Sequence, residues 1–213
     1  MSEIVKKFIA DKFVSTDGVP VHPGNMGDVH EFARDLGSFL YQLHRLPTDG
    51  AVKPSFDNDF AGNDLIFFAA EFMDLLEKYQ KIIPIDFLEE RFEQAARRPW
   101  TKNPVWVIGQ FVPKNLRVAD GKLVGVEVVA QAVSGDPAFD LALAWSLFDE
   151  KARKIFFSAA EADEATINRA RIFALQTALK NYQSADIDEL IQSRDATTEI
   201  LKDFNYTIAQ DMY

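Results

Sequence analysis

Residues 105–115 read VWVIGQFVPKN, residues 120–129 read DGKLVGVEVV, and residues 135–142 read GDPAFDLA. These segments are short runs of Val, Ile and Leu between Gly, Pro, Asn and Asp, a pattern typical of brief strands and tight turns. Asp120-Gly121 favours a two-residue β-hairpin turn. Asp136-Pro137 is typical of a helix start, with Asp as the cap and Pro in the first turn. The sequence therefore predicts a small antiparallel region followed by a helix, Ala138–Phe148, that is apolar nearly all round and central.

Helical patterns dominate the rest of the chain. Asp28 and Glu31 form a capping box before apolar residues at helical spacing, and Pro47 follows the last of them, Leu46. Further helices are predicted over about 64–80, 84–97 and 164–182 and from residue 186 onward, whereas residues 15–27 and 47–63 have the composition of loops. Residues 1–14 fit either a short helix or a strand. We expect an α+β fold that is mainly α.

Composition limits the classes of partner. The 213 residues carry a formal net charge of -10, so a nucleic-acid partner is not expected, because phosphate contacts need clustered Lys and Arg. This charge suits a cationic ligand, although acidity that serves only solubility explains it equally well. The chain has no cysteine, no apolar run long enough to cross a membrane and no secretory signal, which predicts a soluble cytoplasmic protein with no membrane partner. His22, His30 and His44 lack metal-ligand spacing, so no zinc is expected.

The frame of Gly109, Pro113, Asn115, Gly125 and Gly135-Asp136-Pro137 resembles the C-terminal lobe of the aminoglycoside phosphotransferase family, which has the protein-kinase-like fold. That family reads tryptophan-valine-histidine-glycine-aspartate, a loop ending in proline-glycine-asparagine, a hairpin with isoleucine-aspartate-phenylalanine-glycine, and glycine-aspartate-proline before a helix. Residues 32–47 and 169–175 are similar to helices of the same lobe, so the resemblance covers nearly residues 28–205.

The resemblance also implies a domain organisation. Residues 28–213 would form one C-lobe domain, and residues 1–27 would be an N-terminal segment and loop that remains from the link to the amino-terminal lobe. About 27 residues are too few for a five-stranded lobe, so that lobe is expected to be absent.

The departures from the family pattern concern the catalytic groups. Phosphoryl transfer there needs one Asp that receives the hydroxyl proton and a second Asp that holds magnesium. The first position matches Gln110, whose amide cannot take a proton near neutral pH, and the second matches Val128, which offers no oxygen. Asn115 keeps a metal-ligand position of the family. An active member would use magnesium and ATP, but these substitutions predict that no cofactor is bound here.

Three acidic positions have alternative interpretations. Asp136 matches a structural Asp that steadies the family's catalytic loop, although a helix cap explains it as well. Asp140 lies on the same helix face and is expected to be buried and hydrogen-bonded, in a structural role. Glu127 precedes Val128, but alternation along a strand directs its side chain to the opposite face, so it is not expected to replace the lost metal ligand.

Three functions follow from these observations. The leading hypothesis is a catalytically inactive pseudoenzyme that binds a small molecule, such as a cationic one, or a protein partner through the C-lobe cleft. The first alternative is an active aminoglycoside- or macrolide-type phosphotransferase, dependent on ATP or GTP and completed by another chain. The second is an assembly subunit that dimerises through the former interlobe surface.

The assembly hypothesis rests on apolar residues that would otherwise be exposed to water. Such surfaces are normally covered, either by the N-terminal segment folded back over the old cleft or by a second copy in a homodimer. We expect both. The residues concerned are Phe8, Ile9, Phe13, Val14, Phe111, Val112, Val128 and Val129.

Overall fold

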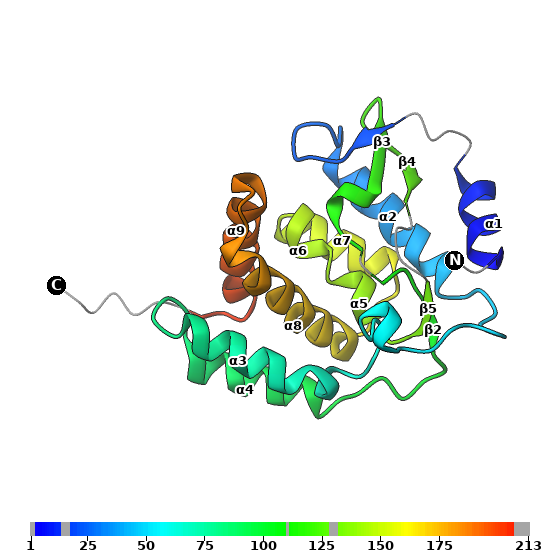
Figure 1. Ribbon diagram of the computed structural model, residues 1–213. Helices are drawn as coiled ribbons and strands as arrows, with labels where there is room; N and C mark the ends of the chain where they lie inside the picture. The colour runs from blue at the N-terminus through cyan, green and yellow to red at the C-terminus, as the bar shows by residue number, and fades with distance from the viewer. Residues whose placement is uncertain (1–2, 14–17, 110, 128–131, 207–213) are drawn as a thin grey trace.

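The computed structural model describes residues 3–13, 18–109, 111–127 and 132–206 and has the expected α+β fold, with helices around two small antiparallel sheets (Figure 1). Its helices are α1 (Glu3–Lys12), α2 (Val29–Leu43), α3 (Ala69–Tyr79), α4 (Ile85–Ala96), α5 (Ala138–Leu141), α6 (Ala144–Leu147), α7 (Glu150–Ala159), α8 (Glu164–Lys180) and α9 (Ile187–Asp203). Its 3-10 turns are η1 (Phe56–Asn58), η2 (Leu65–Phe68), η3 (Pro113–Asn115) and η4 (Asn181–Gln183). Within these residues, no helix has the length and apolar character needed to cross a membrane.

The strands form two separate sheets. Strands β1 (Val19–Pro20), β3 (Leu116–Ala119) and β4 (Lys122–Val126) make a three-stranded sheet in the order β1-β3-β4. Strands β2 (Val105–Val107) and β5 (Val133–Gly135) pair antiparallel, with Trp106 opposite Ser134. The three-stranded sheet lies at the opposite end of the molecule from α3 and α4 (Figure 1). Pairing of β2 with β5 brings the segment before Gly109 next to the segment that contains Asp136.

The predicted hairpin and helix starts are confirmed. Asp120 and Gly121 both have positive φ, 50° and 75°, as a two-residue hairpin turn requires. The Asp28 side chain accepts hydrogen bonds from the backbone N–H groups of His30 and Glu31, which begins α2. Asp186 caps α9 in the same way. The ambiguous N-terminal stretch is a helix, α1.

Four features of the structure differ from expectation. The predicted helix 138–148 consists of two short helices, α5 and α6, because Ser146 N–H bonds to the carbonyl of Leu143 and not to that of Ala142. Within the predicted loop 15–27, Val19 and Pro20 pair with β3. Helix α7 and strand β5 had no predicted counterpart. The α5–α6 segment is nevertheless central, since Ala138, Leu141, Leu143, Ala144 and Trp145 are all buried.

Helix α1 covers α2. The rings of Phe8 and Phe13 each lie 5.5 Å from the ring of Phe39, and Val5 is fully buried. The N-terminal segment therefore folds back, but its described residues lie on α2 and not over the loop that follows β2. Phe111 is buried, 6% exposed, and the lining of the hollow beside it includes none of residues 3–13; that the N-terminal segment covers Phe111 stays a prediction. Val14 lies outside the described residues.

Candidate functional site

Asp140 fixes the loop that follows β2. Its carboxylate is fully buried and accepts the backbone N–H of Ile108 at 2.9 Å (Oδ1) and 3.1 Å (Oδ2). His44 Nε2, from the end of α2, lies 3.3 Å from Asp140 Oδ2. Burial raises the pKa of Asp140, and the hydrogen bonds from His44 and the backbone act in the opposite direction. One buried carboxylate thus ties α5 to the start of this loop and to α2.

Asp136 is held by a buried arginine. Arg169 on α8 donates to it from Nε at 2.6 Å and from a terminal nitrogen at 3.1 Å, a bidentate pair. Asp136 Oδ1 also accepts the backbone N–H of Ala138, so the residue caps α5 as well. A third nitrogen of Arg169 donates to the carbonyl of Arg98. Asp136 therefore connects α5 and α8 and lies within the core, 3% exposed.

Asn115 closes the turn after the loop. It is 1% exposed, and its side-chain oxygen accepts the backbone N–H of Val112 at 2.9 Å. One of the two acceptor lone pairs of this oxygen is thus used within its own turn. Gln110 and Val128, the two degenerate catalytic positions, lie outside the described residues. The neighbours of Gln110, Gly109 and Phe111, are described and lie at the edge of a large hollow.

Glu127 is engaged elsewhere. Its carboxylate forms an ion pair with Arg117 on β3 at 2.5 Å, and its backbone N–H donates to the carbonyl of Asn115. The opposite face predicted for Glu127 relative to Val128 stays a prediction, because Val128 lies outside the described residues. Among the described residues, no group of three or more His, Asp or Glu side chains is placed to hold a metal ion.

The hollow beside Gly109 has a volume of about 740 Å³ and is lined by aromatic rings. Phe60 and Phe67 lie 4.5 Å apart by ring centroids, and Phe139 and Phe173 are also 4.5 Å apart. Phe68 joins the two pairs, because its ring lies 5.2 Å from Phe67 and 5.7 Å from both Phe139 and Phe173. These five rings form one continuous apolar wall, which we call the aromatic hollow.

Charged residues lie along the rim of the aromatic hollow. Glu71 on α3 forms an ion pair with Lys180 at 2.8 Å and accepts the Gln176 amide at 2.6 Å. Glu189 accepts hydrogen bonds from Ser184 and Asn181. Asp59 and the exposed Lys114 complete the charged lining. Carboxylates and amines thus occur together, with no large excess of either.

Sequence reasoning missed the aromatic hollow. Its wall comes from η2, α5 and α8 and from the turn at Phe60, which are far apart in the chain. The available signal was the count of 18 Phe, with five of them between residues 56 and 72. A cluster of this kind is normally core. Here Phe56 and Phe67 are 84% and 49% exposed, so part of the cluster faces solvent.

Comparison with known proteins gives one family match. Residues 15–175 match the family model described as "Phosphotransferase enzyme family". None of the proteins with curated descriptions matches this sequence.

Solved structures similar to the chain show the same fold. A macrolide 2'-phosphotransferase type I is 16% identical with a TM-score of 0.51, over 84% of this chain and 66% of that one. A macrolide 2'-phosphotransferase from Brachybacterium faecium, as apoenzyme, is 18% identical with a TM-score of 0.54, over 84% and 66%. A GDP complex of aminoglycoside 2'-phosphotransferase-IIIa is 16% identical with a TM-score of 0.53, over 83% and 63%. The chain therefore spans 63% to 66% of the length of these structures.

Proposed function

Because this chain belongs to the phosphotransferase enzyme family, we propose that it is a pseudoenzyme that binds a small molecule in the aromatic hollow and does not phosphorylate it. The observation that carries the proposal is the position of this hollow: Gly109 and Phe111, which flank the substituted catalytic position Gln110, both line it. A ligand-sized site is thus kept where the family's catalytic residue is replaced.

The chemistry of the substituted positions supports the absence of transfer. Gln110 cannot act as a general base, and loss of a positioned base lowers a rate by roughly 10²–10⁴. Val128 has no oxygen for magnesium. Asn115 carries an amide and not a carboxylate, and Glu127 is paired with Arg117, so neither supplies the missing carboxylate.

The lining suggests the class of ligand. Five phenylalanine rings favour an apolar body of considerable size, because pockets of roughly 300–1,000 Å³ accommodate drug-sized molecules. Glu71 and Glu189 on the rim already accept hydrogen bonds from neighbouring side chains, but a carboxylate can accept further ones from an amine on such a body, and rings add cation–π attraction. The similar solved structures are named for macrolide and aminoglycoside phosphotransfer. Of these two classes, a macrolide bearing an amino sugar fits an aromatic wall with a polar rim better.

Calorimetry with erythromycin and kanamycin tests the binding. We expect saturable binding of erythromycin that Phe67→Ala weakens at least about tenfold, since one buried aromatic contact contributes roughly 1.5–3 kcal/mol. Ile66→Ala is the matched control, because Ile66 is adjacent and exposed but does not line the hollow. Equal affinity in the two variants, or no binding of either compound, contradicts the proposed site.

A radiolabelled ATP assay with magnesium tests the lack of transfer. We expect no labelled erythromycin or kanamycin above background. Phosphorylation of either compound would show that the chain is an active phosphotransferase, and a one-to-one, magnesium-dependent ATP isotherm would point the same way.

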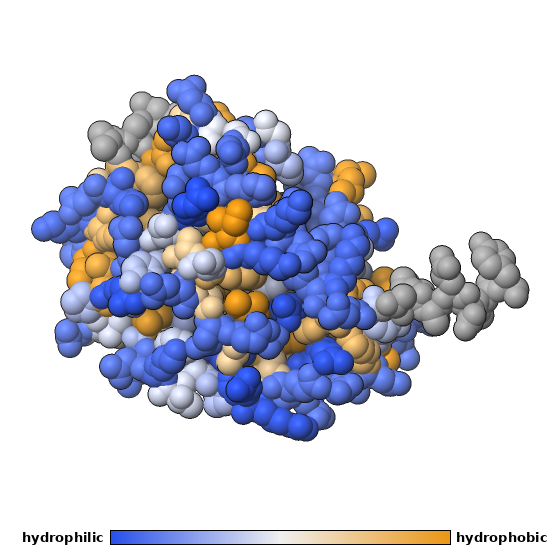
Figure 2. All heavy atoms as spheres, turned by 180° about the vertical axis from the view of Figure 1, so that it is seen from behind, coloured by the Kyte–Doolittle hydropathy of each residue, from blue (hydrophilic) through white to orange (hydrophobic). Residues whose placement is uncertain are grey.

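One observation favours assembly as a second candidate function. Phe56 and Phe67 are exposed in the lining of the hollow, and Ile66 is exposed next to Phe67 in the sequence; exposed apolar groups of this kind favour a protein contact. Seen from the side opposite to that of Figure 1, the surface is mainly hydrophilic, with small hydrophobic areas between the hydrophilic residues (Figure 2). A second copy at the rim would give a particle larger than one 24.1 kDa chain in light scattering. A monomer mass at micromolar concentration excludes this candidate.

A further inference from the structure

A second hollow, distant from the aromatic one, is bordered by arginines. It has a volume of about 340 Å³ and lies between α4, the first half of α8 and the end of α9. Its lining shares no residue with the aromatic hollow. We call it the arginine hollow; the charged residues that line it are Arg91, Arg98, Arg171 and Asp203.

Two arginines of this hollow, Arg91 and Arg171, differ in their partners from five other arginines of the chain. Among the described residues, Arg45, Arg97, Arg117, Arg153 and Arg169 each have a carboxylate oxygen within 3.2 Å. Arg91 and Arg171 instead donate to neutral amide oxygens, those of Gln94 at 2.8 Å and Asn168 at 2.6 Å. An amide oxygen carries no charge to balance a guanidinium, so the positive charge of the hollow is only weakly compensated.

Two buried donors add to this imbalance. The Nε atoms of Arg91 and Arg171 are buried, and within the described part of the chain neither has a hydrogen-bond partner. Arg171 is packed between the rings of Trp145 and Phe204, at 5.6 and 4.8 Å, and burial lowers its pKa. Such donors lose hydrogen bonds to water on folding unless an acceptor replaces them.

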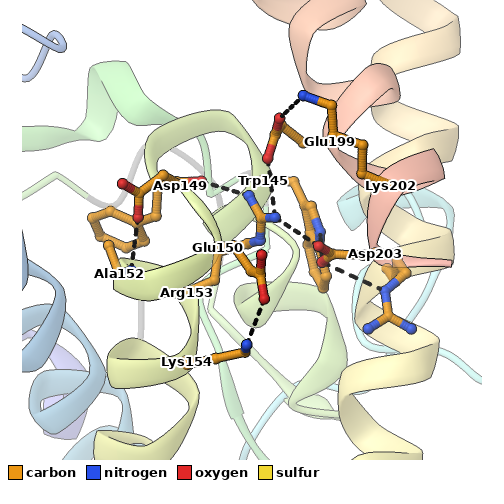
Figure 3. A network of polar contacts seen from close by, with 11 residues as sticks. Trp145, Asp149, Glu150, Ala152, Arg153, Lys154, Glu199, Lys202 and Asp203 are labelled. Carbon is orange, nitrogen blue, oxygen red and sulfur yellow. Dashed lines mark hydrogen bonds and ion pairs between the residues drawn. The ribbon is translucent and has the colours of Figure 1, made fainter. Parts of the chain in front are cut away.

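The nearest carboxylates are occupied. Asp203 lies 3.9 Å from Arg171 Nε, but its oxygens accept from Arg153 at 2.7 Å and from Trp145 Nε1 at 2.9 Å (Figure 3). Glu164 accepts the Asn168 amide and does not line this hollow. Among the described residues that line the hollow, three guanidinium groups therefore meet one carboxylate, that of Asp203, which also pairs with a fourth arginine, Arg153.

We propose that the arginine hollow binds a small oxoanion of the phosphate class, either free phosphate or the phosphate group of a small phosphorylated molecule. Guanidinium groups present planar, paired donors that match phosphate oxygens. A dianion balances the surplus of positive charge better than a single carboxylate does. The volume of about 340 Å³ accommodates such a group with a short attached chain and excludes a folded partner.

The test is a titration of the full chain with inorganic phosphate at constant ionic strength, followed by calorimetry and by the NMR signals of arginine Nε–H groups. We expect saturable binding that shifts the Nε–H signals of Arg91 and Arg171. Arg98→Gln and Arg91→Gln should each weaken binding about tenfold or more, because a charge-assisted hydrogen bond is lost.

Arg97→Gln is the matched control. Arg97 is next to Arg98, is equally exposed and pairs with Glu93, but does not line the hollow. Its variant should bind phosphate as the unmodified chain does. A titration with glycerol 3-phosphate distinguishes the two possible ligands. If it binds more tightly than phosphate, the ligand is a small phosphorylated molecule; if it binds equally or more weakly, the ligand is free phosphate. The same affinity in Arg97→Gln and Arg98→Gln, or no saturation, overturns the proposal.

Discussion

Asp140 holds the start of the loop after β2 through the backbone. It is fully buried and accepts the Ile108 N–H. Asp140→Ala should lower the free energy of unfolding by about 1–3 kcal/mol, since it leaves this buried N–H without a partner. Urea unfolding measures the change. Asp57→Ala, at an exposed position, is the control and should change stability little. If the two variants are equally stable, Asp140 does not hold the loop.

Asp163 gives a pH-dependent prediction. Partial burial alone would raise its pKa, but hydrogen bonds from Lys102 and Thr166 outweigh burial and hold the pKa at about 2, below the ordinary 3.8. Because the pKa of Asp163 is lower in the folded chain than in the unfolded chain, ionised Asp163 stabilises the fold at pH values above about 4. This contribution is lost as the pH falls from about 4 toward about 2.

Asp163→Asn isolates this effect, because Asn also caps a helix but has no charge. The unmodified chain should be more stable than the variant at pH 6 by about 0.2–1 kcal/mol, the range for an exposed ion pair. Urea unfolding at pH 6 and pH 3 should show that this advantage shrinks at the lower pH. A constant difference between the two chains at both pH values contradicts the assigned pKa.

At the residue scale, local sequence indicated roles but not partners. The GDPAFD segment marked Asp136 and Asp140 as structural residues. Their partners, Arg169 and His44, are respectively 33 and 96 residues away in the chain. Hydrophobic spacing and turn composition carry no information on such distant contacts, so sequence patterns alone could not predict them.

At the scale of elements, helices with a capping acid and a regular apolar face were predictable. Helix α7 was not, although Asp149 caps it, because the apolar segment before Asp149 obscured where one helix ended and the next began. The break between α5 and α6 was hidden for a related reason. A segment that is apolar on all sides has no periodicity from which an end can be located.

The crossing of α2 and α7 depends on Gly37. A Cβ at this position would lie 2.4 Å from the carbonyl oxygen of Phe156, a backbone atom that cannot turn aside. Gly37→Ala should therefore destabilise the fold by about 1–3 kcal/mol through overpacking, even though alanine itself favours helix by about 1 kcal/mol.

Asp35→Ala provides the comparison on the same helix, because Asp35 is exposed and also becomes alanine. It should be neutral or slightly stabilising in thermal unfolding, whereas Gly37→Ala should lower Tm. A Tm for Gly37→Ala equal to or above that of the unmodified chain would show that α2 and α7 move apart to admit the Cβ without a loss of stability.

At the scale of the whole molecule, the sequence predicted the family fold but not its cavities. Phe60, Phe68, Phe139 and Phe173 meet only because η2, α5 and α8 pack together. The arginine hollow likewise joins α4 to the end of α9. Both sites arise from tertiary packing, which side-chain periodicity does not encode.

The final prediction concerns the contact that holds α9 to the rest of the fold. Arg153 on α7 is 2% exposed and donates to Asp203 and Glu199 of α9, and Trp145 of α6 also donates to Asp203 (Figure 3). Asp203→Ala should destabilise the chain by about 2–4 kcal/mol. The loss should be below the 3–5 kcal/mol of a fully unpaired buried charge, because Glu199 remains as a partner of Arg153.

A double-mutant cycle separates the ion pair from simple loss of packing. Arg153→Met removes the charge and keeps much of the apolar volume. The double variant should therefore lose less stability than the sum of the losses in the two single variants, by about 0.5–3 kcal/mol. Lys202→Ala removes an exposed neighbour whose ion pair within the described residues is with Glu199, and it should have little effect. Hydrogen exchange should show that α9 loses protection before α2 in Asp203→Ala, because this network joins α9 to α6 and α7 and does not reach α2. Strict additivity in the cycle, or uniform loss of protection in α2 and α9, would mean that α9 is held by its apolar contacts with α8 and not by Arg153.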